Sequence, residues 1–148
     1  MNESERKLVL DRVQQSPAQK VKVAITDIDG ILRGKYIHRD KFFSAVEKGF
    51  GFCNVVFGWD MGDCVYDKVS YTGWHTGYPD ALVEIDLSSF REVPWDSHVP
   101  FFLGHFVDAD QTPLKVCPRQ LLISVIQRCE KLGFIPKVGL EFEWFNFR

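Results

Sequence analysis

The sequence contains no long apolar segment and no excess of charge of one sign. Its first residues are mostly polar and charged, without the apolar stretch of a signal peptide, and no later apolar run is long enough to cross a bilayer. The 18 Lys and Arg nearly balance the 20 Asp and Glu, leaving a net charge of −2. A near-neutral surface gives no electrostatic reason to bind nucleic acid or an anionic membrane. We therefore expect a cytoplasmic protein without either partner.

Cysteine is also sparse, and its spacing excludes the common cysteine-based sites. The four cysteines never form a C-x-x-C pair, and none of the four histidines lies at a short metal-ligand spacing from them. This pattern argues against a structural zinc site and against a disulfide framework. We interpret the cysteines as reduced thiols, as is usual for cytosolic proteins.

The 148 residues suffice for one ordinary domain, or for a small domain and the start of another. Asp29-Gly30 is a turn signal between two alternating runs and predicts a hairpin, and Ser88-Ser89 predicts a second turn. The order of elements favours an α+β fold with a mainly antiparallel sheet. Helical spacing is found at 3–15, 39–48 and 118–132, and strand-like patterns at 21–26, 31–37, 81–86, 99–108 and 137–147.

The last stretch, residues 137–148, carries two carboxylates in an alternating pattern typical of a strand. Glu141 and Glu143 would lie on one face of that strand, roughly 7 Å apart. Two carboxylates on one face repel unless a cation lies between them, and hard cations such as Mg²⁺ or Mn²⁺ prefer oxygen ligands. The spacing alone favours a solvent-exposed strand face over a metal site, and both interpretations remain open at this point.

An acidic motif near the start offers one candidate chemistry. An apolar strand followed by Asp27-x-Asp29-Gly30 resembles the opening motif of haloacid-dehalogenase-type phosphatases, and Gly62-Asp63 through Asp67 resembles their late metal motif. In that chemistry the first Asp attacks phosphorus beside Mg²⁺. Too few residues separate the two motifs to hold the βα units of such a core. A simple hairpin turn is the alternative for both aspartates.

An ordered set of motifs covers most of the chain and resembles the N-terminal part of the glutamine synthetase family, especially the branch that uses amines other than ammonia. The resemblance runs from about residue 21 to the end, and its final motif is the most specific. The set consists of Asp27-x-x-Gly30-x-x-Arg33-Gly34-Lys35, Gly49-x-Gly51-Phe52, Tyr78-Pro79-Asp80, Pro94-Trp95, Phe106-x-Asp108-x-Asp110-x-x-Pro113, Cys117-Pro118-Arg119, Leu132-Gly133 and Gly139-x-Glu141-x-Glu143-Trp144-Phe145.

The resemblance implies a β-grasp-like domain followed by a truncated catalytic domain. It places an N-terminal helix or tail at 1–17, the β-grasp-like domain at 18–112, and the first helix and strand of the catalytic domain at 113–148. The implied reaction joins ammonia or another amine to the γ-carboxyl of glutamate through γ-glutamyl phosphate, with ATP as co-substrate. Glu141 would bind the ATP-side Mg²⁺ or Mn²⁺ and Glu143 the metal near glutamate. The fragment alone would be inactive.

The family also builds each active site between subunits of a homo-oligomeric ring. The loop that the first domain lends across the interface contains Asp-Gly-Ser-Ser in ammonia-using members, whereas this chain has Gly58 to Asp63 without Ser-Ser. Asp60 is the better match for the ammonium-binding Asp and Asp63 the second. The departure leaves open ammonia, a polyamine or ethanolamine as acceptor. A non-catalytic structural relative is the alternative from another class.

Several other residues have predictable roles. Arg33 and Lys35 would share a strand face and are interpreted as structural rather than as a phosphate-binding pair. Arg119 lies in the first turn of a helix, where a cation opposes the helix dipole, so we expect a specific partner such as a carboxylate. The remaining candidates, expected to anchor the core or a subunit interface, are Trp59, Trp74 and Trp95.

Overall fold

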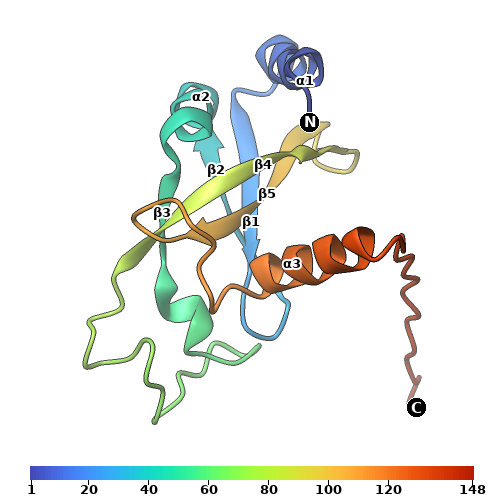
Figure 1. Ribbon diagram of the computed structural model, residues 1–148. Coiled ribbons are helices and arrows are strands. Elements are labelled where there is room, and N and C mark those ends of the chain that lie inside the picture. The colour runs from blue at the N-terminus through green and yellow to red at the C-terminus, as the bar shows by residue number, and fades with distance from the viewer.

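The computed structural model describes residues 1–148 and contains three α-helices, five strands and one 3-10 helix (Figure 1). No helix is both long and apolar enough to span a membrane. The elements are α1 (Glu3–Gln15), β1 (Lys20–Thr26), β2 (Leu32–His38), α2 (Arg39–Lys48), β3 (Phe50–Cys53), η1 (Asn54–Phe57), β4 (Asp80–Val93), β5 (Val99–Val107) and α3 (Pro118–Lys131).

The strands form one sheet in the order β2-β1-β5-β4-β3. β1 pairs with β5 in parallel, and the other three pairs are antiparallel. The first hairpin, the helix that follows it and the central parallel pair make a β-grasp-like arrangement. The expected α+β fold with a mainly antiparallel sheet is therefore confirmed, with β5 as the strand that makes the sheet mixed.

The hydrophobic core lies between the sheet and the first two helices. Alternate residues of β1 face this core, because side chains of a strand point to opposite sides in turn. Val21, Val23 and Ile25 are accordingly almost fully buried. Phe42 of α2 packs on Phe102 of β5 with ring centroids 4.7 Å apart. These contacts hold the β1–β2 hairpin and the following loops in place.

The helix boundaries follow the signals in the sequence. Asn2 caps α1 through a reciprocal capping box with Glu5, which satisfies two otherwise unpaired amides. Gly49, with φ of 69°, ends α2 in a left-handed conformation that favours glycine. Pro118 occupies the first turn of α3. The three predicted helices are confirmed to within one residue.

The expected turn at Ser88-Ser89 is wrong, because these residues lie inside the long strand β4. The register with β5 shifts between Asp86 and Arg91, which marks a bulge. The hydroxyl of Ser89 accepts a hydrogen bond from the Leu103 amide at 2.8 Å and donates to the Asp86 carbonyl at 2.5 Å. A serine side chain thus replaces ladder hydrogen bonds, so the strand continues where the sequence suggested a break.

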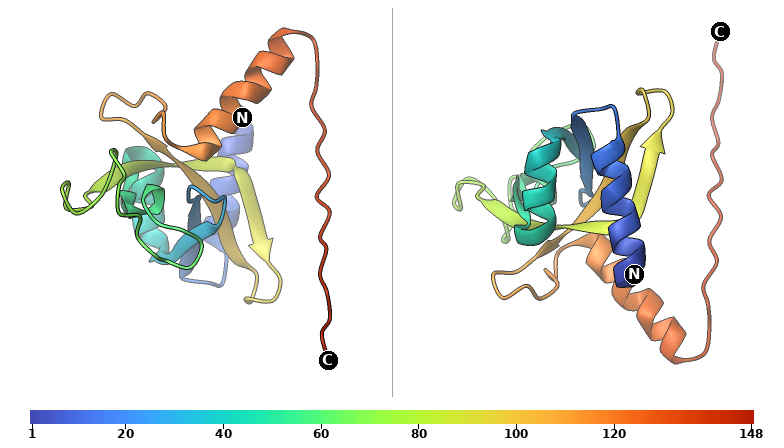
Figure 2. Two further views of the ribbon diagram at one scale, coloured as in Figure 1. Left: turned by 90° about the horizontal axis from the view of Figure 1, so that it is seen from below. Right: turned by 90° about the horizontal axis from the view of Figure 1, so that it is seen from above.

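The expected strand at 137–147 is not formed, and residues 134–148 follow α3 as an extended segment (Figure 2). A strand requires a neighbour for its backbone hydrogen bonds, and no segment of this chain pairs with this one. The apolar face of α3 is also uncovered, with Leu121 at 62% and Leu122 at 57% exposure. The first helix after residue 113 is confirmed; its first turn contacts the sheet, but Leu121, Leu122 and Val125 on its apolar side are exposed.

Candidate functional site

The turn of the β1–β2 hairpin is organised by Asp27, which is fully buried. Its Oδ1 accepts hydrogen bonds from the amides of Asp29 at 3.0 Å and Ile31 at 2.8 Å, and its Oδ2 accepts one from Arg33 Nε at 2.7 Å. Both carboxylate oxygens therefore have structural partners. Gly30 adopts φ of 81°, as a tight turn requires. Asp27 is a turn-forming residue, and the phosphatase interpretation has no accessible nucleophile here.

Arg33 connects this turn to the loop that follows η1. Its guanidinium donates from Nη2 to the Asp60 carbonyl at 3.2 Å and from Nη1 to the Asp63 carboxylate. The same group lies over the Trp59 ring, 4.8 Å from its centroid. The hydrogen bond to Asp27 is the main cause that raises the pKa of Arg33, with Asp63 adding to it. The structural role expected for Arg33 is confirmed by these contacts.

The loop at residues 58–65, which we call the Asp60 loop, is closed by its own Asp60 side chain. Asp60 Oδ1 accepts hydrogen bonds from the amides of Gly62 at 2.8 Å and Cys64 at 2.9 Å. The other oxygen, Oδ2, accepts none from the chain. Asp63 is exposed and has φ of 65°, a conformation that aspartate adopts more readily than most residues. Asp60 thus presents one free carboxylate oxygen from a tightly closed loop.

A buried polar pair supports the base of the Asp60 loop. The Thr72 hydroxyl donates to Asn54 Oδ1 at 2.6 Å, and both side chains are buried. A Cβ on Gly58 would lie 2.8 Å from the Thr72 methyl group, so this position accepts only glycine without displacement. The aromatic segment after residue 70 is therefore packed against the start of the loop. Sequence reasoning missed this pair, because neither residue belongs to a recognisable motif.

The two predicted metal ligands lie far from these residues in the chain and are both exposed, in the extended segment after α3. No group of three or more His, Cys, Asp or Glu side chains is arranged to hold a metal ion. Glu141 and Glu143 supply only carboxylate oxygens, and this donor set fits a hard cation such as Mg²⁺ or Mn²⁺. Two carboxylates are fewer ligands than such an ion takes, so further ligands would have to come from outside this chain.

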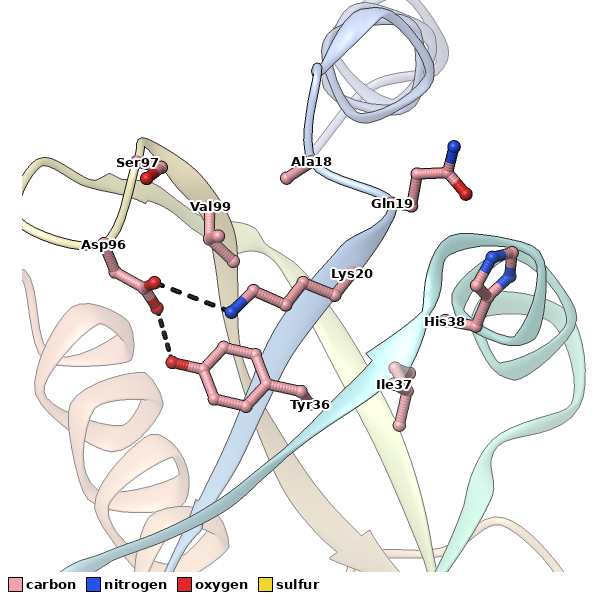
Figure 3. A pocket seen from close by; sticks show the side chains of 9 residues that line it. All are labelled: Ala18, Gln19, Lys20, Tyr36, Ile37, His38, Asp96, Ser97 and Val99. Atoms are coloured by element: carbon pink, nitrogen blue, oxygen red, sulfur yellow. Dashed lines mark hydrogen bonds and ion pairs between the residues drawn. The ribbon is translucent and has the colours of Figure 1, made fainter.

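A cavity of about 530 Å³ opens at the other end of the hairpin (Figure 3). Lys20 pairs with His38 at this end of β1, whereas Thr26 pairs with Leu32 beside the Asp27 turn. Inside the cavity Asp96 accepts a hydrogen bond from the Tyr36 hydroxyl and lies 3.6 Å from Lys20 Nζ. The charges of the cavity are thus already paired with one another.

These pairings shift the ionisation of the cavity residues. The hydrogen bond from Tyr36 lowers the pKa of Asp96, and the neighbouring lysines lower it further. The same bond raises the pKa of the Tyr36 hydroxyl. Both effects stabilise a carboxylate paired with a neutral phenol. The contact fastens the turn between β4 and β5 to the β1–β2 hairpin and gives the cavity no free charge.

Arg119 meets the carboxylate that its position predicted. Its Nη2 donates to Asp86 Oδ2 on β4, which attaches α3 to the sheet. Burial acts to raise the pKa of Asp86, but hydrogen bonds from Ser88 and Arg119 outweigh it and lower the pKa. The partner could not be named from the sequence, because Asp86 and Arg119 come together only through the packing of α3 on the sheet.

The three tryptophans that were expected to be anchors, out of four in the chain, have different environments. Trp59 is partly buried and packs against the core beneath Arg33, as expected for an anchor. Trp74 and Trp95 are 85% and 87% exposed, so neither belongs to the core of this chain. Lys35 is structural as predicted, because it donates to the Gly51 carbonyl at 3.1 Å. The predicted sites therefore remain separate here, with Asp60 near the hairpin turn and the two glutamates beyond α3.

The β-grasp-like fold and the sequence relatives point to the same class of protein. The chain belongs to the glutamine synthetase family. No protein-family sequence model matches the chain. Type-1 glutamine synthetase 2 of Dictyostelium discoideum is 50% identical over 95% of the chain and 27% of its own length. Glutamate–isopropylamine ligase of Pseudomonas sp is 33% identical over 98% of the chain and 32% of its own length.

A solved structure of a glutamine synthase homologue is 26% identical, with a TM-score of 0.65 over 78% of the chain and 28% of its own length. The chain therefore spans between a quarter and a third of the length of these relatives. The family predicted from the ordered motifs is confirmed, and so is the likeness to ligases that use amines.

Proposed function

We propose that this chain is the N-terminal part of an ATP-dependent ligase that joins ammonia or another amine to the γ-carboxyl of glutamate through γ-glutamyl phosphate. The observation that carries the proposal is the 50% identity to a glutamine synthetase over 95% of the chain. Residues 18–112 would form its β-grasp-like domain after an N-terminal helix at 1–17. Residues 113–148 would begin its catalytic domain.

The catalytic role of the end of the chain rests on Glu141 and Glu143. In the full-length protein these residues would form a strand, with other strands of the catalytic domain as neighbours. Glu141 would then bind the ATP-side Mg²⁺ or Mn²⁺, and Glu143 the ion on the glutamate side. Such ions neutralise phosphate oxygens during phosphoryl transfer. Glu141 and Glu143 are both exposed in this chain, so their carboxylates are accessible to a metal ion.

The acceptor amine would be bound by Asp60, across a subunit interface of a cytoplasmic homo-oligomeric ring. Supporting this role, Asp60 Oδ2 accepts no hydrogen bond from the chain, while Oδ1 closes the loop. A carboxylate oxygen without a donor can accept one from an ammonium group. The absence of Ser-Ser after Asp60 and the amine named for the Pseudomonas relative both support an acceptor larger than ammonia.

The proposal is tested by phosphate release from ATP with the full-length protein, glutamate and a panel of amines. We expect release that requires glutamate and is stimulated by one class of amine, with γ-glutamyl amide as the product. Release that does not depend on glutamate would contradict a ligase. A folded, oligomeric protein without any ATP turnover would instead identify a non-catalytic structural relative.

A further inference from the structure

We infer that Arg33 is a positioning residue for the acceptor amine, because it fixes the Asp60 loop against the buried turn at Asp27. The inference rests on the proposed function and adds a residue that makes no contact with substrate itself. Its structural basis is one guanidinium that makes three contacts in two separate segments, the hairpin turn and the Asp60 loop. The contacts are with the carboxylate of Asp27 in the turn, and with the carbonyl of Asp60 and the carboxylate of Asp63 in the loop.

The first step of the argument is that Arg33 is itself held rigidly. Asp27 is fully buried, and two backbone amides fix its carboxylate before Arg33 is added. The Arg33 side chain is only 17% exposed, and its planar group lies over Trp59. A guanidinium carries its donors in a fixed fork, so fixing Nε also fixes the directions of Nη1 and Nη2.

The second step is that, apart from the backbone hydrogen bonds of its first residue, Gly58, with Val55 and Tyr66, the loop is hydrogen-bonded to the domain by Arg33 alone. The hydrogen bonds of Asp60 to Gly62 and Cys64 fix the internal shape of the loop but not its place on the sheet. Between residues 59–65 and the rest of the chain, the only hydrogen bonds are those that Arg33 donates. Trp59 packs the start of the loop against the core, and Arg33 supplies the hydrogen bonds that hold the Asp60 end of the loop on the sheet.

The third step concerns the consequence for the amine. Arg33 donates a hydrogen bond to the backbone carbonyl of Asp60 and leaves Oδ2 of the Asp60 side chain free. A displacement of about 1 Å at a substrate-positioning group is costly in binding and rate. Loosening the loop should therefore weaken capture of the amine. ATP and glutamate, whose proposed ligands lie elsewhere, should be unaffected.

The test uses the full-length protein with Arg33→Met and Arg33→Lys, and Lys35→Met as the matched control. Lys35 lies two residues along the same strand and donates to Gly51 rather than to the Asp60 loop. Hydrogen exchange of the peptide covering residues 58–65 should be at least about ten-fold faster in Arg33→Met and unchanged in Lys35→Met. Arg33→Lys should be intermediate, because an ammonium cannot reproduce the fork.

Steady-state kinetics provide the second measurement. With the amine that the wild type uses best, Arg33→Met should raise the KM for the amine at least about ten-fold, which corresponds to about 1.4 kcal/mol. The KM values for ATP and glutamate should stay within about two-fold, and Lys35→Met should match the wild type. This selective change is not expected from general destabilisation, which would alter all three substrates.

The outcomes separate this inference from the proposed function. Unchanged exchange in Arg33→Met would overturn the inference whatever the kinetics. Faster exchange with an unchanged KM for the amine would overturn it as well, since the loop position would then not matter for capture. A wild-type protein without glutamate-dependent phosphate release would refute the proposed function, and the role of Arg33 toward an amine would fall with it.

Discussion

Replacing Asp27 by asparagine tests whether the turn depends on a buried charge. Asparagine preserves the volume and can still accept from the amides of Asp29 and Ile31. Its amide group would then face Arg33 Nε, which is a donor, at the site of a 2.7 Å hydrogen bond. The substitution therefore removes the Asp27–Arg33 interaction while changing little else.

The expected loss follows from the burial of the pair. A hydrogen bond to a charged group contributes about 1.5–3 kcal/mol, and breaking a buried ion pair costs about 3–5 kcal/mol. Because Asp27 is fully buried and the Arg33 side chain is 17% exposed, we expect Asp27→Asn to lower the free energy of unfolding by about 2–4 kcal/mol. Asp27→Ala should cost more, since both backbone amides lose their acceptor.

Urea unfolding followed by circular dichroism of the 148-residue chain measures these changes. A double-mutant cycle with Arg33→Met should give a coupling energy of about 1–3 kcal/mol. The matched control is the pair of Arg6 and Glu47, whose side chains are 29% and 66% exposed. A surface pair of this kind should couple by only about 0–1 kcal/mol. Equal stability of Asp27→Asn and the wild type would refute the reasoning.

Three further predictions concern the sheet and the end of the chain. Gly104→Ala places a Cβ 2.6 Å from a Val83 methyl group, so urea unfolding should show a loss of about 1–3 kcal/mol through overpacking. Burial is the main cause that lowers the pKa of His105 below its ordinary 6.5; the unfolded state then gains a proton first on acidification. Stability should fall as the pH drops from about 7.5 to 5.5, with a slope of at most about 1.4 kcal/mol per pH unit, and His105→Gln should flatten that slope in pH-dependent urea unfolding. In the full-length protein, Glu143→Gln should raise the Mg²⁺ concentration for half-maximal phosphate release at least about ten-fold, whereas Glu130→Gln on the exposed side of α3 should not.

Local sequence signals located most of the elements correctly. The helices at 3–15 and 39–48 and the hairpin around Gly30 follow from periodicity, caps and a turn residue, which act between neighbours in the chain. The bulge in β4 could not be found in this way. Ser88 and Ser89 look like a turn locally, and only the neighbouring strand shows that the Ser89 hydroxyl pairs with Leu103.

The proposed site was predictable only in part. The motif around Asp27 was visible in the sequence, but it resembles a catalytic nucleophile in one family and a hairpin turn in another. The burial of Asp27 decides between them, because it depends on residues brought together from different segments, and the hydrogen bond from Arg33 occupies the carboxylate within the hairpin. Likewise the charge of Arg119 predicted a carboxylate, and the packing of α3 identified Asp86 as that partner.

The sequence by itself determined the family, because the order and spacing of short motifs can be recognised without knowing the structure. It also determined the alternation that brings Glu141 and Glu143 onto one side of an expected strand. The tertiary structure decided that this strand does not form without a neighbour, since backbone hydrogen bonds need a second segment. It also decided that Arg33 holds the Asp60 loop, because that contact depends on how β2 and the loop pack together.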